Sequence, residues 1–137
     1  MKPHRELAHY LAEIETALRA LPAAYVESYV EEVLTPTRAN LRVRVRFSGG
    51  QMLAMSEAVV IADETLVHLD YRYHCQGPDN ELLFRYDSAP HFPEVFGFPE
   101  HKHLANGVVS AARPEIRELL AEASVGDDET GRTHPTR

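Results

Sequence analysis

Seven polar residues in the second half of the chain have the side-chain types that metal-free RNA cleavage requires. Such cleavage needs a base for the 2′-hydroxyl group, an acid for the leaving oxygen, and cations that stabilise the charge around phosphorus. Histidine suits both proton transfers because its ordinary pKa of about 6.5 is close to neutral pH. The candidate catalytic residues are His74, Arg85, Asp87, His91, His101, Lys102 and His103.

We expect most of these side chains to line one pocket, with His74 at its edge. The segment that carries Arg85 leads directly into the segment that carries His91, so these two start close together. In the predicted site Arg85 and Lys102 hold the phosphate. Asp87 orients a histidine or an arginine. We expect no cofactor.

Two other interpretations of the histidines stay open. His101 and His103 alternate, so in an extended segment they point the same way, and His91 or Glu94 could complete a metal site. Lys102 between them adds positive charge, which disfavours a cation. The histidines could also form a hydrogen-bonded cluster with a purely structural role.

The segment between Phe84 and His103 must position these groups. It contains three prolines, which exclude a helix or a central strand over that stretch. Its apolar residues, Phe92, Val95, Phe96 and Phe98, predict a Pro-rich loop anchored on a scaffold. Loops held in this way often carry function.

Hydrophobic periodicity predicts the scaffold. Apolar residues at three- and four-residue spacing indicate a helix over 4–21, and alternation indicates strands at 41–47, 65–75 and 81–87. β-Branched and aromatic residues indicate a strand at 25–33, and the tight connection at 48–50 predicts a hairpin that leads into a strand at 51–61. Asn106-Gly107 indicates a turn before a short extended piece at Val108-Val109, and a last helix is predicted over 113–120. The fold class is therefore α+β, with an N-terminal helix packed on an antiparallel meander of about five strands.

Alternation also assigns side chains to faces of the sheet. Leu41, Val43, Val45 and Phe47 should face the core, with Arg42, Arg44 and Arg46 opposite. Likewise Val67, Leu69, Tyr71, Tyr73 and Cys75 should share one face, opposite His68, Asp70, Arg72 and His74. If the polar sets coincide, one face carries a dense mixture of Arg, His and Asp. Cross-strand ion pairs on an ordinary solvated face would also explain the three arginines.

Length, composition and charge limit the classes of protein to which this chain can belong. The chain has 137 residues and a formal net charge of −7, which speaks against a general nucleic-acid coat. We expect one domain over residues 1–123 and a disordered polar tail over 124–137. No apolar run is long enough to span a membrane and the N-terminus lacks a signal-peptide core, so we expect a cytoplasmic protein. Cys75 is expected to be a small buried hydrophobe.

Four motifs, in order and with matching spacing, resemble the TumE family, small prokaryotic toxins of type II toxin–antitoxin systems. They are YRYHCQ (71–76), FRYDSAPHFPE (84–94), GFPEHKH (97–103) and RPEIRELL (113–120). The chain departs from the family pattern at Ser88, Phe92 and Glu100. Phe92 and Glu100 replace frequent histidines, and this weakens the metal interpretation most.

The resemblance implies a toxin that a small antitoxin neutralises, usually a helix-turn-helix DNA-binding protein encoded beside it. A homodimer and a hetero-oligomer with the antitoxin are both open. RNA as the target is inferred from the residue types and from how such toxins commonly act. The alternatives are a non-enzymatic interaction or regulatory module, or a metal-binding histidine-cluster protein.

Overall fold

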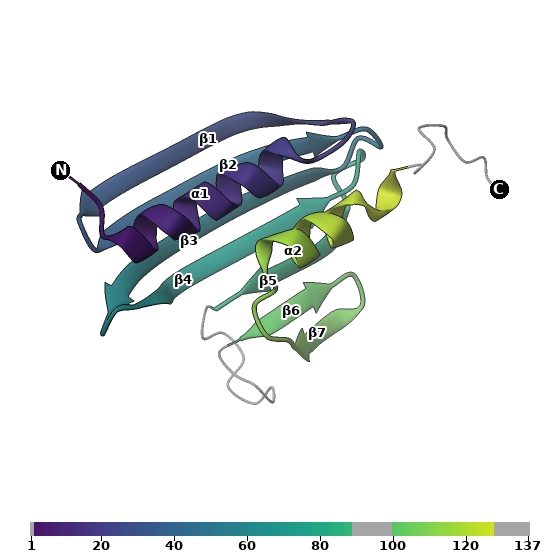
Figure 1. The fold of residues 1–137 in the computed structure, drawn as a ribbon. Coiled ribbons are helices and arrows are strands. Elements are labelled where there is room, and N and C mark those ends of the chain that lie inside the picture. The colour runs from purple at the N-terminus through teal and green to yellow at the C-terminus, as the bar shows by residue number, and fades with distance from the viewer. Residues whose placement is uncertain (1, 89–99, 128–137) are drawn as a thin grey trace.

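The computed structural model describes residues 2–88 and 100–127. The elements are α1 (Arg5–Arg19), β1 (Ala24–Thr35), β2 (Arg38–Phe47), β3 (Met52–Ala62), β4 (Thr65–Gln76), β5 (Leu82–Asp87), β6 (His101–Leu104), β7 (Gly107–Ser110), α2 (Ile116–Ala123) and the 3₁₀ helix η1 (Ser124–Gly126). The strands form one antiparallel sheet in which each strand pairs with the next along the chain (Figure 1).

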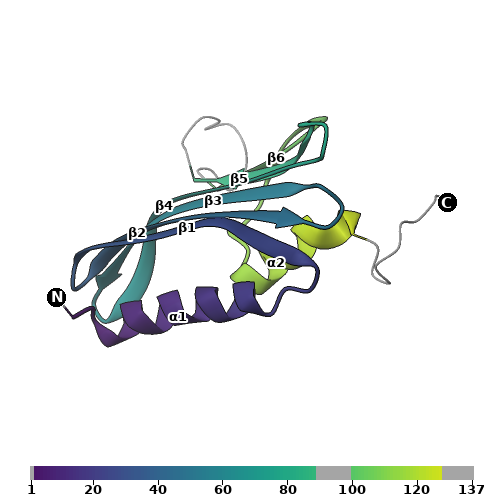
Figure 2. The same cartoon turned by 90° about the horizontal axis from the view of Figure 1, so that it is seen from above.

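Both α-helices pack on the same face of the sheet (Figure 2). The buried side of α1 follows helical spacing through Leu7, Leu11, Ile14 and Leu18, and His4 caps its first turn by accepting the Glu6 backbone N–H. In α2, Glu115 is the N-cap and forms a capping box with Glu118. The first helical residue is therefore Ile116. The predicted N-terminal and C-terminal helices are confirmed.

The predicted strand count is wrong, because the described part of the chain has seven strands. The five predicted strands correspond to β1–β5, and β6 and β7 form an additional hairpin. In this hairpin Leu104 pairs with Gly107, where Gly107 has φ 152°. Each of the two strands has only four residues, so alternation has too few positions to reveal them.

A β-bulge in β4 reverses the predicted face of several side chains. Ala58 pairs with Asp70 while the adjacent Val59 pairs with His68, so Leu69 is an extra residue. Val67 and Leu69 are therefore 40% and 50% exposed, and His68 turns towards the helices. The prediction that His68 shares a face with Arg72 and His74 is wrong. A one-residue insertion shifts the period-2 pattern on one side of it.

The core lies between the sheet and the helices. It joins Ile14 of α1 and Leu119 of α2 to inward-facing residues of β2–β5, including Leu41, Val43, Leu53, Met55, Tyr73 and Phe84. Within the described residues, no helix has the length and apolar character needed to cross a membrane.

The end of α2 is tied to the turn between β2 and β3. Gln51 donates its side-chain N–H to the Ala123 carbonyl at 3.0 Å, and Gly49 donates its backbone N–H to Asp127 at 2.6 Å. The first four residues of the predicted tail, 124–127, thus comprise η1 and a contact with the sheet. Residues 128–137 lie outside the described residues.

Candidate functional site on the open face of the sheet

The face of the sheet opposite the two helices, here termed the open face, carries two rows of paired residues. Strand pairing aligns the Ser56 row, which consists of Val30, Arg42, Ser56, Arg72, Asp87, His101 and Ser110. The neighbouring Ala54 row consists of Ser28, Arg44, Ala54, His74, Arg85, His103 and Val108. Adjacent strands lie about 4.8 Å apart, so neighbours within a row can contact one ligand.

The two rows form because inward-facing side chains alternate with them. Val43 and Val45 of β2 are buried beneath the helices, so Arg42 and Arg44 must face the other way. Tyr86 of β5 belongs to the same core, which sends Arg85 and Asp87 to the open face. The short strand β6 then places two histidines beside these side chains.

Asp87 is the centre of a compact cluster in these rows. Its Oδ1 lies 2.7 Å from Nε2 of His101, and its Oδ2 lies 3.6 Å from Nε2 of His103. Arg85 donates through Nε to the Asp87 Oδ2 at 3.3 Å. The centroids of the two imidazole rings are 4.8 Å apart. The carboxylate therefore lies within ion-pair distance of two histidines and one arginine.

Access to the cluster differs among its members. His101 and Asp87 are buried, whereas the side chains of His103 and Arg85 are 11% and 25% exposed. His74 is half-buried and neighbours Arg85 in the Ala54 row, with its Nε2 at 2.9 Å from the Gln76 amide oxygen. A bound molecule can thus reach His74, Arg85 and His103 more readily than His101.

Asp87, His101 and His103 also have the geometry of a potential metal site. Each offers one ligand atom, and these atoms all lie within 4.8 Å of one another. Two imidazoles and a carboxylate are common ligands for transition-metal ions. The Arg85 guanidinium beside the carboxylate acts against a bound cation, because it already supplies positive charge there.

Lys102 does not join this cluster. It points towards the helices, where Nζ donates to Glu122 at 2.6 Å and lies 4.9 Å from the centroid of the Tyr86 ring. Burial alone would lower the pKa of Lys102, but its contacts with Glu122 and Tyr86 outweigh burial and raise the pKa. His91, the remaining candidate, lies outside the described residues.

The positive charge of the arginines on β2 is partly neutralised. Arg44 and Arg46 both donate through Nε to the Glu27 carboxylate, at 3.1 and 2.9 Å. These hydrogen bonds lower the pKa of Glu27. For Arg44 and Arg46, the prediction of cross-strand ion pairs on a solvated face agrees with these contacts.

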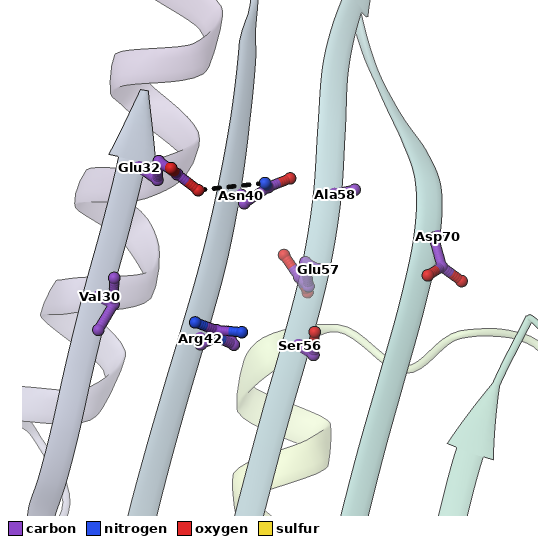
Figure 3. A pocket seen from close by; sticks show the side chains of 8 residues that line it. All are labelled: Val30, Glu32, Asn40, Arg42, Ser56, Glu57, Ala58 and Asp70. Atoms are coloured by element: carbon purple, nitrogen blue, oxygen red, sulfur yellow. Dashed lines mark hydrogen bonds between the residues drawn. The ribbon is translucent and has the colours of Figure 1, made fainter. Parts of the chain in front are cut away.

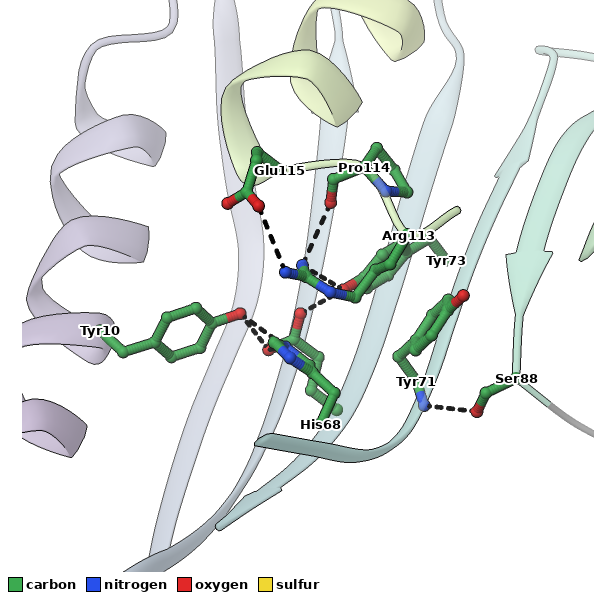
Figure 4. Close-up of polar contacts among 9 residues, drawn as sticks. Tyr10, His68, Tyr71, Tyr73, Ser88, Arg113, Pro114 and Glu115 are labelled. Atoms are coloured by element: carbon green, nitrogen blue, oxygen red, sulfur yellow. Dashed lines mark hydrogen bonds and ion pairs between the residues drawn. The ribbon is translucent and has the colours of Figure 1, made fainter. Parts of the chain in front are cut away.

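Sequence reasoning missed a polar network on the face of the sheet that packs against the helices, here termed the covered face. Its centre is Glu57, and Figure 4 shows Tyr10, His68, Tyr73 and Arg113 of this network. Tyr10 donates to Glu57 at 2.6 Å, Tyr73 donates to its other oxygen, and His68 Nε2 lies 3.3 Å away. Burial alone would raise the pKa of Glu57, but its contacts with one histidine and two tyrosines outweigh burial and lower the pKa. Arg113 extends the network by donating to the Tyr73 hydroxyl at 3.3 Å.

One sequence signal could have indicated this network. Glu57 stands at a core position of β3, since its alternating neighbours Met55 and Val59 are buried. A charged residue at such a position requires partners. Its partner His68 was hidden by the β4 bulge, and Tyr10 and Arg113 are distant in sequence.

Comparison with known proteins identifies the family. Searches of curated proteins and of solved structures gave no match. The family model described as Toxin TumE matches residues 14–125, which span both helices in part or whole and every strand of the sheet. The match also includes the Asp87 cluster and both rows of the open face. The chain therefore belongs to the Toxin TumE family, whose members are toxins of toxin–antitoxin systems.

Proposed function

We propose that this toxin acts in the cytoplasm and cleaves RNA by acid–base catalysis on the open face, without a bound metal ion. The observation that carries the proposal is the order His74, Arg85, His103 in one row. Two histidines flank a cation, and the Cα positions of the outer pair are separated by two strand spacings, about 10 Å. A phosphodiester over Arg85 would lie between both histidines.

The proposed step needs only these groups. One histidine takes the proton of the 2′-hydroxyl as the 2′-oxygen forms a bond with phosphorus, and the bond between phosphorus and the 5′-oxygen breaks. The other histidine, protonated at the start, gives its proton to the departing 5′-oxygen. The products are a 2′,3′-cyclic phosphate and a free 5′-hydroxyl. During the step, Arg85 stabilises the negative charge that develops on the oxygens around phosphorus.

Asp87 and His101 are positioning residues in this scheme. Nε2 of His103 faces the Asp87 carboxylate, so its Nδ1 is the nitrogen available for proton transfer. At His74, a substrate oxygen would replace the Gln76 amide at Nε2. The buried His101 contacts Asp87 on its other oxygen and holds the carboxylate in place.

Membership in a toxin family implies an antitoxin partner. We infer that this partner is a helix-turn-helix protein encoded beside the toxin. An acidic protein gains little long-range attraction to RNA, so control by tight protein–protein contact suits it. The two chains, expressed together, are expected to co-purify at physiological salt, and their separation would remove the support for this partner.

Cleavage of cellular RNA by the purified protein, with and without a chelator, tests the catalytic proposal. Wild-type protein is expected to cleave in both conditions. The variants His74→Ala and His103→Ala should each be slower by about 10²–10⁴-fold at an unchanged melting temperature. Wild-type protein that is inert in both conditions would overturn the proposal. Variants that lose both toxicity and antitoxin binding while still folded would indicate a docking surface.

A metal-dependent nuclease is the second candidate, favoured by the mutual distances of the three ligand atoms in the Asp87 cluster. In that case Asp87, His101 and His103 would hold a divalent ion. Chelation would then abolish cleavage, and addition of Zn²⁺ or Mn²⁺ would restore it. The same chelator experiment therefore separates the two candidates.

A further inference from the structure

Two hollows lie side by side on the open face and share Ser56. The first is lined by Val30, Glu32, Asn40, Arg42, Ser56, Glu57, Ala58 and Asp70, and the second by Ala54, Met55, Ser56, Arg72 and His74. Each has a volume of about 250 Å³. Figure 3 shows the first hollow, with Arg42 on β2 and Asp70 on β4 on either side of β3. Because the two hollows share Ser56 of β3, they are here termed together the groove.

The groove exists because the open-face side chains of β3 are small. Ala54, Ser56 and Ala58 form its floor, while longer side chains from β2 and β4 form its walls. In the Ser56 row, strand pairing places Arg42 on one side of Ser56 and Arg72 on the other. Two guanidinium groups thus flank a hydroxyl.

These two arginines differ from the neighbouring Arg44 and Arg46. Arg44 and Arg46 share an ion pair with the Glu27 carboxylate, whereas no described residue forms an ion pair with Arg42 or Arg72. Both are exposed. Guanidinium groups bind phosphate oxygens well because their donors are planar and can act in pairs. On a chain of net charge −7, two such groups beside a groove are a local exception.

The first hollow, at the end of the groove away from Arg72, also carries two carboxylates. Glu32 accepts a hydrogen bond from the Asn40 amide at 3.3 Å, and Asp70 accepts one from Ser88 at 2.9 Å. Both carboxylates line the first hollow and repel an anion there. An anion is therefore confined to the part of the groove between Arg42 and Arg72, over Ser56.

We propose that Arg42, Ser56 and Arg72 form a phosphate-binding subsite for single-stranded RNA. Arg72 is paired directly with Asp87, so the subsite lies one strand away from the proposed catalytic cluster. A single-stranded RNA bound over Ser56 would place one phosphate between Arg42 and Arg72. It would direct a neighbouring phosphate towards Arg85. The connection to cleavage rests on the proposed function, but RNA binding at the subsite does not require cleavage.

Fluorescence anisotropy with a labelled single-stranded oligoribonucleotide tests the subsite. Complete 2′-O-methylation of this probe prevents cleavage, so affinity is measured by itself. Arg42→Gln and Arg72→Gln should each weaken binding about tenfold and lower the slope of log affinity against log salt by about one. The matched control is Arg117→Gln, an exposed arginine on the helix side, which removes the same charge and should leave affinity within about twofold.

Two further variants test the shape and the charge of the groove. Ser56→Leu should weaken binding because it fills the floor, and Glu32→Gln should strengthen it because it removes a repelling carboxylate. The subsite is overturned if wild-type protein does not bind the probe, or if Arg42→Gln and Arg72→Gln bind as Arg117→Gln does. If these two variants weaken binding while wild-type protein fails to cleave unmodified RNA, the subsite stands and the proposed cleavage falls.

Discussion

Two buried carboxylates, Glu57 and Asp87, lie on opposite faces of the same sheet, and each is next to histidine. On the covered face, two tyrosine hydroxyls donate to Glu57 and His68 lies beside it. On the open face, Asp87 is surrounded by two imidazoles and one guanidinium, and the guanidinium of Arg85 is the most exposed of the three.

The difference lies in where each set of contacts leads. The partners of Glu57 connect α1 to the segment before α2, through Tyr10 and Arg113. The partners of Asp87 continue along the two rows to exposed arginines. We infer that the Glu57 network stabilises the packing of the helices, and that the Asp87 cluster holds side chains ready for a bound molecule.

The largest expected effect on stability comes from removing the Glu57 carboxylate. Glu57→Ala removes the carboxylate that accepts from the Tyr10 and Tyr73 hydroxyls and lies beside His68, and should lower the free energy of unfolding by about 3–5 kcal/mol. Urea denaturation measures this loss. Glu13→Ala, an exposed acid on α1, is the control and should stay within about 0.5 kcal/mol. Equal midpoints for the two variants would contradict a stabilising role for the network.

Glu57 also predicts a pH dependence of stability. Its pKa in the folded protein is lowered from the ordinary value of 4.5. The carboxylate therefore contributes stability above about pH 4.5, and the contribution is lost as the pH falls through the lowered pKa. Between pH 6 and pH 3, as approximate limits, wild-type protein should lose more stability than Glu57→Gln. Parallel stability profiles for the two proteins would show that Glu57 is not the responsible group.

A smaller effect is expected at Lys102. Its ion pair with Glu122 joins β6 to α2, but both side chains are partly exposed. Lys102→Ala should therefore lower the free energy of unfolding by only about 1 kcal/mol. Thermal denaturation of this variant beside Glu122→Ala measures the pair. If Lys102→Ala lowered the free energy of unfolding as much as Glu57→Ala does, the prediction that the Lys102–Glu122 pair contributes less than the Glu57 network would be wrong.

The smallest effect concerns Cys75, which is buried in the core. Burial, with a minor contribution from Glu122, raises the pKa of the Cys75 thiol to about 12. The thiolate fraction at pH 8 is therefore negligible. Native protein should not react with a thiol-specific chromogenic reagent, while urea-unfolded protein should react fully. Rapid labelling of the native protein would contradict this placement.

Local alternation was sufficient to predict much of the fold and part of the site. It placed Arg42, His74, Arg85 and Asp87 on the correct sides of their strands, because each strand is long enough for a period of two. It did not reveal that His101 and His103 belong to a strand, since β6 has four residues.

Other features depend on contacts between distant segments. The bulge at Leu69 arises from pairing with β3, and no local pattern marks it. The two rows likewise depend on the register of all seven strands, which is set by packing. The same alternation that joins His101 to His103 sends Lys102 to the other face, although the residue types suggested one shared pocket.

Lys102 and His103 provide the most direct test of the claim that function resides on the open face. They are adjacent in β6 and point to opposite faces of the sheet. Growth of a bacterial host is measured after induction of wild-type toxin, Lys102→Ala or His103→Ala, with soluble protein and antitoxin co-purification checked for each. We predict that wild-type toxin and Lys102→Ala arrest growth and that His103→Ala does not, although all three bind the antitoxin. Growth arrest by His103→Ala, with loss of arrest in a folded Lys102→Ala, would contradict the account.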